Sequence, residues 1–79
     1  MEYNTQEIME RFSKERKKNN YTQEALANAV GVNAKTISAY ECGRKNPSLK
    51  MFIKMCVIIN ANVNYIVYGK NNMLEEMEK

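Results

Sequence analysis

The sequence contains no histidine, and its two cysteines, Cys42 and Cys56, are not spaced like metal ligands. A zinc site is therefore not expected. Three glycines and one proline among 79 residues disfavour a β protein built from tight turns. The longest apolar run, residues 55–59, is far shorter than the ~20 residues of a membrane-spanning helix, and the first residues lack the pattern of a signal peptide. These absences predict a small helical domain in the cytoplasm.

Charge is distributed unevenly along the chain. Twelve basic and nine acidic residues give a net charge of +3. Acidic residues gather at both ends, with a net charge of −3 over residues 1–10 and −2 over residues 71–79, whereas residues 11–70 carry +8. A basic centre of this kind is typical of a protein that binds a polyanion such as nucleic acid. A solvated, lysine-rich surface remains the alternative at this point.

Capping residues divide the chain into helical segments. Asn, Ser or Thr precedes each apolar segment, where its side chain can accept a hydrogen bond from the first turn. Gly or Asn follows each segment, as is typical where a helix ends in the left-handed conformation. The predicted helices cover about 4–19, 23–30, 34–42, 49–59 and 63–68, opened by Asn4, Thr22, Asn33, Ser48 and Asn62 and closed by Asn19–Asn20, Gly31, Gly43, Asn60 and Gly69.

The apolar residues of these segments recur at helical spacing and predict one shared core. Cys56 belongs to this set, because a free cysteine usually packs as a small hydrophobe. The expected core-facing residues are Ile8 and Phe12, in line with the position of Arg16, then Leu26, Ala27, Val30, Leu49, Phe52, Met55, Cys56, Ile59, Val63, Ile66 and Val67.

Residues 22–43, TQEALANAVGVNAKTISAYECG, form the most informative stretch. Two segments of about two turns each are joined through Gly31, and a connection this short forces the sharp crossing of a helix-turn-helix. A helix hairpin alone says little about function, which depends on the side chains of the second segment.

The second segment has two contrasting arcs on a helical wheel. The bulky Ile37 and Tyr40 share one arc and predict its core side. A helix that is merely solvated would usually mix acidic with basic residues on the other arc, but here that arc holds only short or basic side chains and can approach the major groove of DNA. The residues of this outward arc are Ala34, Lys35, Ser38, Ala39 and Cys42.

Two charged residues occupy inward positions. Arg16 lies on the apolar stripe of the first helix and Glu41 on the inward arc of the third. Because neither charge can be buried alone, we expect them to pair and to tie the two helices together. The alternative is that both side chains reach solvent past the edge of the core.

The loop after the third helix adds two cations and an amide beside the outward arc. Together with Gln23 and the free N–H groups that begin the second helix, they predict partners for DNA phosphates around this face. The loop residues are Arg44, Lys45 and Asn46.

These residues carry a family pattern. The chain resembles the Cro/phage-repressor-like (XRE) helix-turn-helix family from about Ile8 to Gly69. The resemblance is carried by Thr22-Gln23-Glu24, Leu26-Ala27, Gly31-Val32, Thr36-Ile37-Ser38, Glu41-x-Gly43-Arg44, Asn46-Pro47-Ser48, Asn62-Val63 and Tyr68-Gly69.

The resemblance implies an all-α, five-helix bundle of the phage-repressor type, whose third helix enters the major groove. Ala34, Lys35, Ser38 and Ala39 would face base edges. Gln23, Asn33, Arg44, Lys45 and Asn46 would contact phosphates, and Arg16 and Glu41 would match the buried ion pair of many members. Members commonly bind palindromic sites as dimers, with half-sites about one turn (~34 Å) apart.

One departure from the family pattern bears on specificity. Ala34 stands where many members carry glutamine or another long polar side chain, and Ala39 is also short. An alanine can touch a thymine methyl group but cannot form a bidentate hydrogen bond. Direct recognition would then depend on Lys35 and Ser38, and Lys35 could reach either a guanine or only a phosphate. Specificity would be modest or would depend on DNA shape.

We therefore expect sequence-specific binding to double-stranded DNA, by a small transcriptional regulator that acts as a repressor and as a homodimer. One alternative is the antitoxin of a toxin–antitoxin pair, which would bind both DNA and a toxin. Another is a protein-interaction adaptor without DNA binding, which the charge distribution disfavours. No nucleophile–base arrangement or phosphate-binding glycine loop supports catalysis, so no enzyme activity, cofactor or small-molecule ligand is expected.

The DNA-binding domain is expected to cover residues 1–70 and to be followed by a short tail, residues 71–79. The tail either extends as a helix that packs on a second subunit, through Met73, Leu74 and Met77, or is a frayed end. Tyr65 and Tyr68 are candidates for a dimer surface, or else for the edge of the core.

Overall fold

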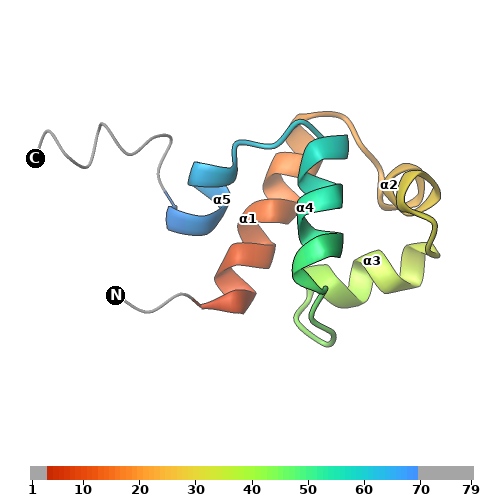
Figure 1. Cartoon of the computed structure of the whole chain (residues 1–79), viewed down its shortest axis with the longest axis horizontal. Helices are drawn as coiled ribbons and strands as arrows, with labels where there is room; N and C mark the ends of the chain where they lie inside the picture. The colour runs from red at the N-terminus through yellow and green to blue at the C-terminus, as the bar shows by residue number, and fades with distance from the viewer. Residues whose placement is uncertain (1–3, 70–79) are drawn as a thin grey trace, which may run out of the picture.

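The computed structural model describes residues 4–69 as helices, turns and loops. The helices are α1 (Thr5–Lys18), α2 (Gln23–Val30), α3 (Ala34–Glu41), α4 (Leu49–Ile58) and α5 (Val63–Tyr68) (Figure 1). The all-α prediction is confirmed, and each predicted range agrees to within about a residue at either end, the usual uncertainty of helix boundaries. The predictions for the tail, including Met73, Leu74 and Met77, lie outside the described residues.

Hydrogen bonds within single turns explain these boundaries. All five predicted capping residues accept a hydrogen bond from the backbone N–H of the third helical residue, which satisfies one of the donors that a helix start leaves unpaired. The predicted terminators Asn20, Gly31, Gly43, Asn60 and Gly69 all have a positive φ. Most helix ends are therefore encoded locally.

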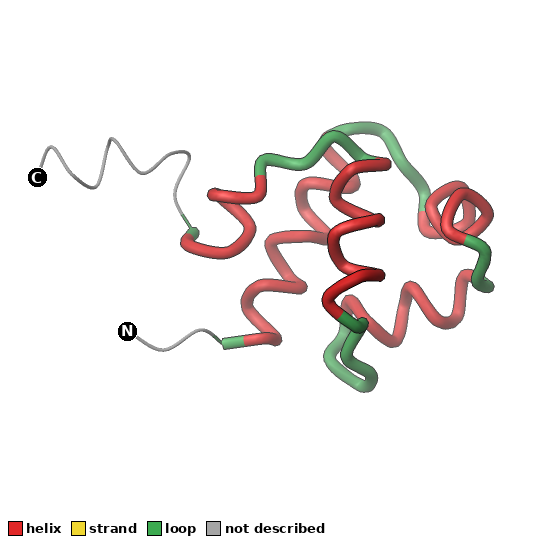
Figure 2. Tube along the Cα trace, in the orientation of Figure 1, coloured by secondary structure: helices red, strands yellow, loops and turns green. Residues whose placement is uncertain are grey.

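The helices are arranged around α1. It packs against α5 on one side and against α3 on the other, while α2 packs against α3 and α4. α5 and both ends of the described chain lie on one side of the molecule, and α2 and α3 lie on the opposite side (Figures 1 and 2). Among residues 4–69, no helix is both long and apolar enough to cross a membrane.

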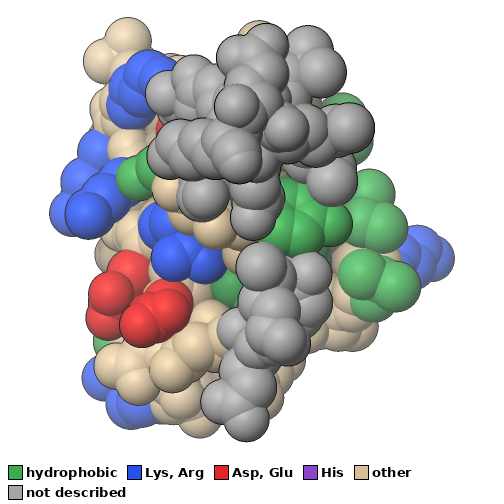
Figure 3. Space-filling view, turned by 90° about the vertical axis from the view of Figure 1, so that its left-hand side faces the viewer, with side chains coloured by type: hydrophobic (Ala, Val, Ile, Leu, Met, Phe, Trp, Pro, Cys, Tyr) green, Lys and Arg blue, Asp and Glu red, His purple; other side chains and the backbone are tan. Residues whose placement is uncertain are grey.

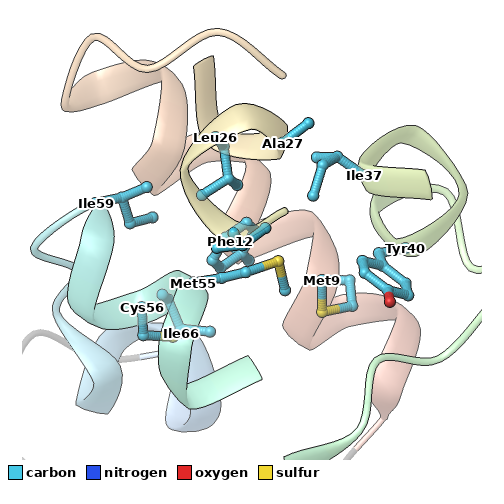
Figure 4. Close-up of a cluster of buried hydrophobic side chains, with 11 residues drawn as sticks. Met9, Phe12, Leu26, Ala27, Ile37, Tyr40, Met55, Cys56, Ile59 and Ile66 are labelled. Atoms are coloured by element: carbon cyan, nitrogen blue, oxygen red, sulfur yellow. The ribbon is translucent and has the colours of Figure 1, made fainter. Parts of the chain in front are cut away.

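All five helices contribute to one apolar core (Figure 4). Phe12 of α1 is fully buried, and its ring centroid lies 6.2 Å from that of Phe52 of α4. Cys56 packs in the core as predicted, and burial raises the pKa of its thiol to about 11. The buried apolar residues are Met9, Phe12, Leu26, Ala27, Val30, Ile37, Tyr40, Met55, Cys56, Ile59 and Ile66.

The core prediction was wrong for Leu49 and Val63, which are 74% and 47% exposed. Each is the first residue of its helix and lies at the rim of the bundle, where no described element covers it. Met9, which the predicted stripe of α1 omitted, is buried at the centre instead. Spacing along one helix identifies a face but not how far the neighbouring helices extend over it.

A polar stripe on α1 holds the ends of α4 and α5. Arg11 donates to two carbonyl groups near the end of α5, at 2.7 and 3.1 Å. The buried Glu15 accepts a hydrogen bond of 3.0 Å from the backbone N–H of Asn62, which opens α5. Asn19 donates to the carbonyl of Ile59 at the end of α4, at 2.8 Å. Arg11, Glu15 and the C-cap Asn19 are spaced by four and so share one face of α1 and its C-terminal end.

Candidate nucleic-acid interface

The connection between α2 and α3 forms the predicted helix-turn-helix. Gly31 ends α2 with φ of 82°, a left-handed conformation that a side chain would strain. The N–H groups of Gly31 and Val32 both donate to the carbonyl of Ala27, which turns the chain away from α2. Asn33 then opens α3 by accepting from the backbone N–H of Thr36 at 2.9 Å. The turn therefore fixes α3 relative to α2 within three residues, 31–33.

α3 has the two faces predicted from the wheel. Ile37 and Tyr40 are buried in the core. On the opposite side Lys35 and Cys42 are exposed, and the short side chains between them are half-buried. The half-buried residues of this outward face are Ala34, Ser38 and Ala39. Apart from Lys35, this face has only short side chains, and none of its side chains is acidic.

The loop after α3 lies beside this face. The backbone N–H groups of Arg44 and Lys45 both donate to the carbonyl of Ala39, at 3.0 and 3.2 Å, so the loop folds back over the last turn of α3. The side chains of Arg44, Lys45 and Asn46 are all exposed. Two cations are thereby held at one end of the outward face.

The start of α2 provides backbone N–H groups, and the structure gives Gln23 a partner that the sequence did not predict. The hydroxyl of Thr22 accepts from the N–H of Ala25, which leaves earlier N–H groups of this turn without a partner in the helix. The side-chain Nε2 of Gln23 donates to Oε1 of Glu41 at 3.0 Å. The side-chain amide of Gln23 is therefore held by a hydrogen bond to Glu41.

The structure brings Arg16 and Glu41 together. Arg16 Nε lies 2.7 Å from Glu41 Oε2, and the two side chains are only 6% and 7% exposed. The arginine also donates to Glu41 Oε1 at 3.0 Å and to the carbonyl of Tyr21 at 2.7 Å. Sequence reasoning missed Ser13, whose hydroxyl donates to the same oxygen of Glu41 at 3.1 Å. Its position one turn before Arg16 on α1 was the available signal.

Acidic side chains are found elsewhere on the surface. The side of the molecule that carries α5 shows acidic and basic side chains close together (Figure 3). Two exposed glutamates, Glu7 and Glu10, lie in the first half of α1. The outward face of α3 thus differs in charge from this other side.

Comparison with known proteins agrees with this geometry. A helix-turn-helix family model matches residues 13–66. An uncharacterized HTH-type transcriptional regulator of Archaeoglobus fulgidus is 45% identical over 67 residues, which cover 84% of this chain and 94% of the relative. The uncharacterized HTH-type transcriptional regulator YqaE of Bacillus subtilis is 30% identical over 63 residues, covering 80% of this chain and 54% of that protein.

The chain belongs to the Cro/phage-repressor-like (XRE) helix-turn-helix family. It is a DNA-binding transcriptional regulator. The crystal structure of the restriction-modification controller protein C.AhdI from Aeromonas hydrophila has the same fold, with a TM-score of 0.70 over 78% of this chain and 90% of that chain at 21% identity.

The family match includes every residue of this XRE-type site. It begins at Ser13 and runs through α2, α3 and the basic loop to Ile66. The ion pair and the start of α2 therefore lie within the family region, and so do the outward face of α3 and the loop.

Replacing Glu41 by glutamine should destabilise the fold. The change keeps the shape of the side chain but leaves Arg16 buried without an opposite charge, and removing one partner of a buried pair costs about 3 kcal/mol or more. Thermal and urea unfolding followed by circular dichroism measure the loss. Glu10→Gln, a matched change at an exposed position of α1, should alter stability by less than about 0.5 kcal/mol. Equal melting temperatures for the two variants would contradict the structural role of the pair.

Proposed function

We propose that this XRE-family protein is a sequence-specific repressor that places α3 in the major groove of double-stranded DNA. The observation that carries the proposal is the outward face of α3, which is free of acidic side chains and is bordered by exposed cations of the following loop. A helix that fills the groove excludes other proteins from the same DNA, so repression by occupancy is the simplest outcome. The protein is proposed to act in the cytoplasm.

The contacts to bases are proposed for the outward residues of α3. Lys35 is the exposed long side chain of this face and can reach an acceptor on guanine, while Ser38 can donate to or accept from a base edge. The methyl groups of Ala34 and Ala39 suit contact with thymine. Because only two of these four residues can hydrogen-bond, part of the specificity is proposed to come from DNA shape.

The contacts to phosphates are proposed for the residues around that face. Arg44, Lys45 and Asn46 follow α3, and Asn33 opens it. Gln23 lies at the first position of α2, beside backbone N–H groups that suit an anion. Such contacts position the protein on the duplex without reading its sequence.

A second copy of the chain is proposed to dock on an apolar stripe of α4. The α4 stripe consists of Leu49, Ile53 and Val57, which are 74%, 53% and 73% exposed and are spaced by four along one face. Beside it, a groove of about 330 Å³ lies between Val57 and Val63 of α5. Monomeric proteins rarely expose a large contiguous apolar patch. A two-fold axis through the stripe would pack the stripe of one copy against the same stripe of the other.

Dimerisation would in turn suit a palindromic site with half-sites about one turn apart. We therefore propose that the main dimer contact is the stripe of α4 and not Tyr65 or Tyr68 of α5. Tyr65 is half-buried and lines a small polar cavity with Lys14 and Lys18.

Selection from a randomised DNA pool at about 150 mM salt tests the function directly. We expect a palindromic winner that is bound ~10³-fold or more tightly than scrambled DNA. Placed between a promoter and a reporter gene, this sequence should lower expression when the protein is present. Equal, weak binding to every duplex would contradict a sequence-specific regulator, and a winner without two half-sites would contradict the dimer.

Two single substitutions should separate recognition from positioning. Lys35→Ala should weaken binding to the selected site by about tenfold and reduce discrimination against scrambled DNA, because it removes a base contact. Arg44→Ala should weaken binding to both DNAs alike and reduce the salt slope by about one unit, because it removes a phosphate contact. Fluorescence anisotropy over a range of salt concentrations measures both quantities. Loss of discrimination with an unchanged slope in Arg44→Ala would contradict its proposed role.

Val57→Glu should abolish dimerisation, because the substitution places a charge in the apolar stripe, where the stripe borders the groove that Val63 also lines. Sedimentation equilibrium should show a concentration-dependent dimer for the native chain and a monomer for the variant. Lys17→Gln makes the same change in net charge at an exposed position of α1 and should leave the dimer intact. A native chain that is monomeric at every concentration would contradict the proposed dimer.

A further inference from the structure

We propose that Glu41 is a positioning residue for DNA binding, because its carboxylate orients the amide of Gln23 toward a DNA phosphate. The inference rests on the proposed function and adds to it a role for a residue that is itself too deeply buried to reach DNA. Glu41 would thus act on DNA through α2 as well as holding α1 and α3 together.

The carboxylate of Glu41 receives donors from two other helices. Oε2 accepts from Arg16 Nε at 2.7 Å. Oε1 accepts from Arg16 Nη2 at 3.0 Å, from the hydroxyl of Ser13 at 3.1 Å and from Gln23 Nε2 at 3.0 Å. Ser13 and Arg16 belong to α1, whereas Gln23 belongs to α2. Gln23 is therefore the connection between this buried cluster and the start of α2.

The chemistry of the carboxylate fixes which end of the Gln23 amide faces it. An ionised glutamate accepts hydrogen bonds and cannot donate them, so the amide nitrogen, and not the amide oxygen, must face Glu41. That nitrogen carries two N–H groups in the plane of the amide, and the hydrogen bond to Oε1 uses one. The orientation of the second N–H is therefore determined by Glu41.

The second N–H lies in a suitable environment for a phosphate. Gln23 is half-buried, so part of its side chain meets solvent, and it is the first residue of α2. The backbone N–H groups of this turn that Thr22 does not cap need an acceptor, and the helix dipole favours an anion there. A side-chain donor on the residue that begins the helix, already held by Glu41, would add to such a phosphate contact without further ordering on binding.

The opposite orientation of the Gln23 amide is unfavourable for DNA binding. Without Glu41 the amide could rotate and present its oxygen, which would repel a phosphate. A glutamine side chain also has several rotatable bonds, and fixing them in advance removes an entropic cost from the complex. Loss of Glu41 should therefore weaken DNA binding only when Gln23 is present.

A double-mutant cycle on the full chain tests this dependence. Affinity for the duplex selected from the randomised pool is measured at about 150 mM salt for the native chain, Gln23→Ala, Glu41→Gln and the double variant, at a temperature at which circular dichroism shows all four folded. Each single variant should bind about tenfold more weakly, in line with the loss of one hydrogen bond to a charged group. The double variant should be no more than about twofold weaker than Gln23→Ala. Because glutamine is uncharged, Gln23→Ala should keep the native salt slope.

Ser13→Ala is the matched control. It removes one hydrogen bond from the same oxygen of Glu41 and leaves the hydrogen bond between Glu41 and Gln23 in place, so DNA affinity should change by less than twofold. Equal losses from Glu41→Gln in the presence and absence of Gln23 would overturn the proposal, because Glu41 would then act only by holding α3 in place. Native affinity in Gln23→Ala would also overturn the proposal for Glu41. The proposed function would still hold in that case if Arg44→Ala weakens DNA binding.

Nuclear magnetic resonance of the native chain gives a second measurement that needs no stable variant of Glu41. The two side-chain N–H protons of Gln23 should be well separated in chemical shift, with one insensitive to the selected duplex and the other shifted on its addition. Unchanged positions of both protons at saturating DNA would overturn the proposal.

Discussion

The bundle depends on the buried carboxylate of Glu41 and the arginine that neutralises it. Glu41 is the last residue of α3, and its donors come from α1 and α2, so one side chain fixes the mutual position of three helices. The arginine also bonds the carbonyl of Tyr21, which immediately precedes the cap of α2. In a domain this small the apolar core alone supplies little stability, and a fully satisfied polar cluster restricts the geometry that the core would otherwise allow.

Both ends of α5 are matched to charge by side chains of α1. Arg11 places a cation on the carbonyl groups that end α5, and Glu15 places an anion at the N–H that opens the same helix. Each charge therefore has the sign that the helix dipole favours, worth about 0.3–1 kcal/mol per site. α5 has six residues and would not be stable in isolation. The side chains of α1 thus stabilise both ends of a helix too short to persist alone.

The sequence predicts local features of this protein better than features that depend on several helices. Caps and terminators act within one turn, so the ends of all the described helices could be found from residues such as Thr22 and Gly31. The two faces of α3 follow from periodicity in the same way. The exposure of Leu49 and Val63 could not be predicted, because it depends on where α1 and α5 end relative to α4. The hydrogen bond between Gln23 and Glu41 joins residues eighteen positions apart, and no periodicity connects them.

The short side chains on the outward face of α3 bear on the thermodynamics of association. An alanine has no rotamers to lose, and a serine has few, whereas ordering a lysine costs up to about 2 kcal/mol. Of the residues proposed to face the bases, only Lys35 is long and exposed. Most of this surface therefore has the same shape before and after contact with a groove. Short side chains can rearrange little to adjust to the groove. Small differences in groove width between DNA sequences would therefore change the steric fit of α3.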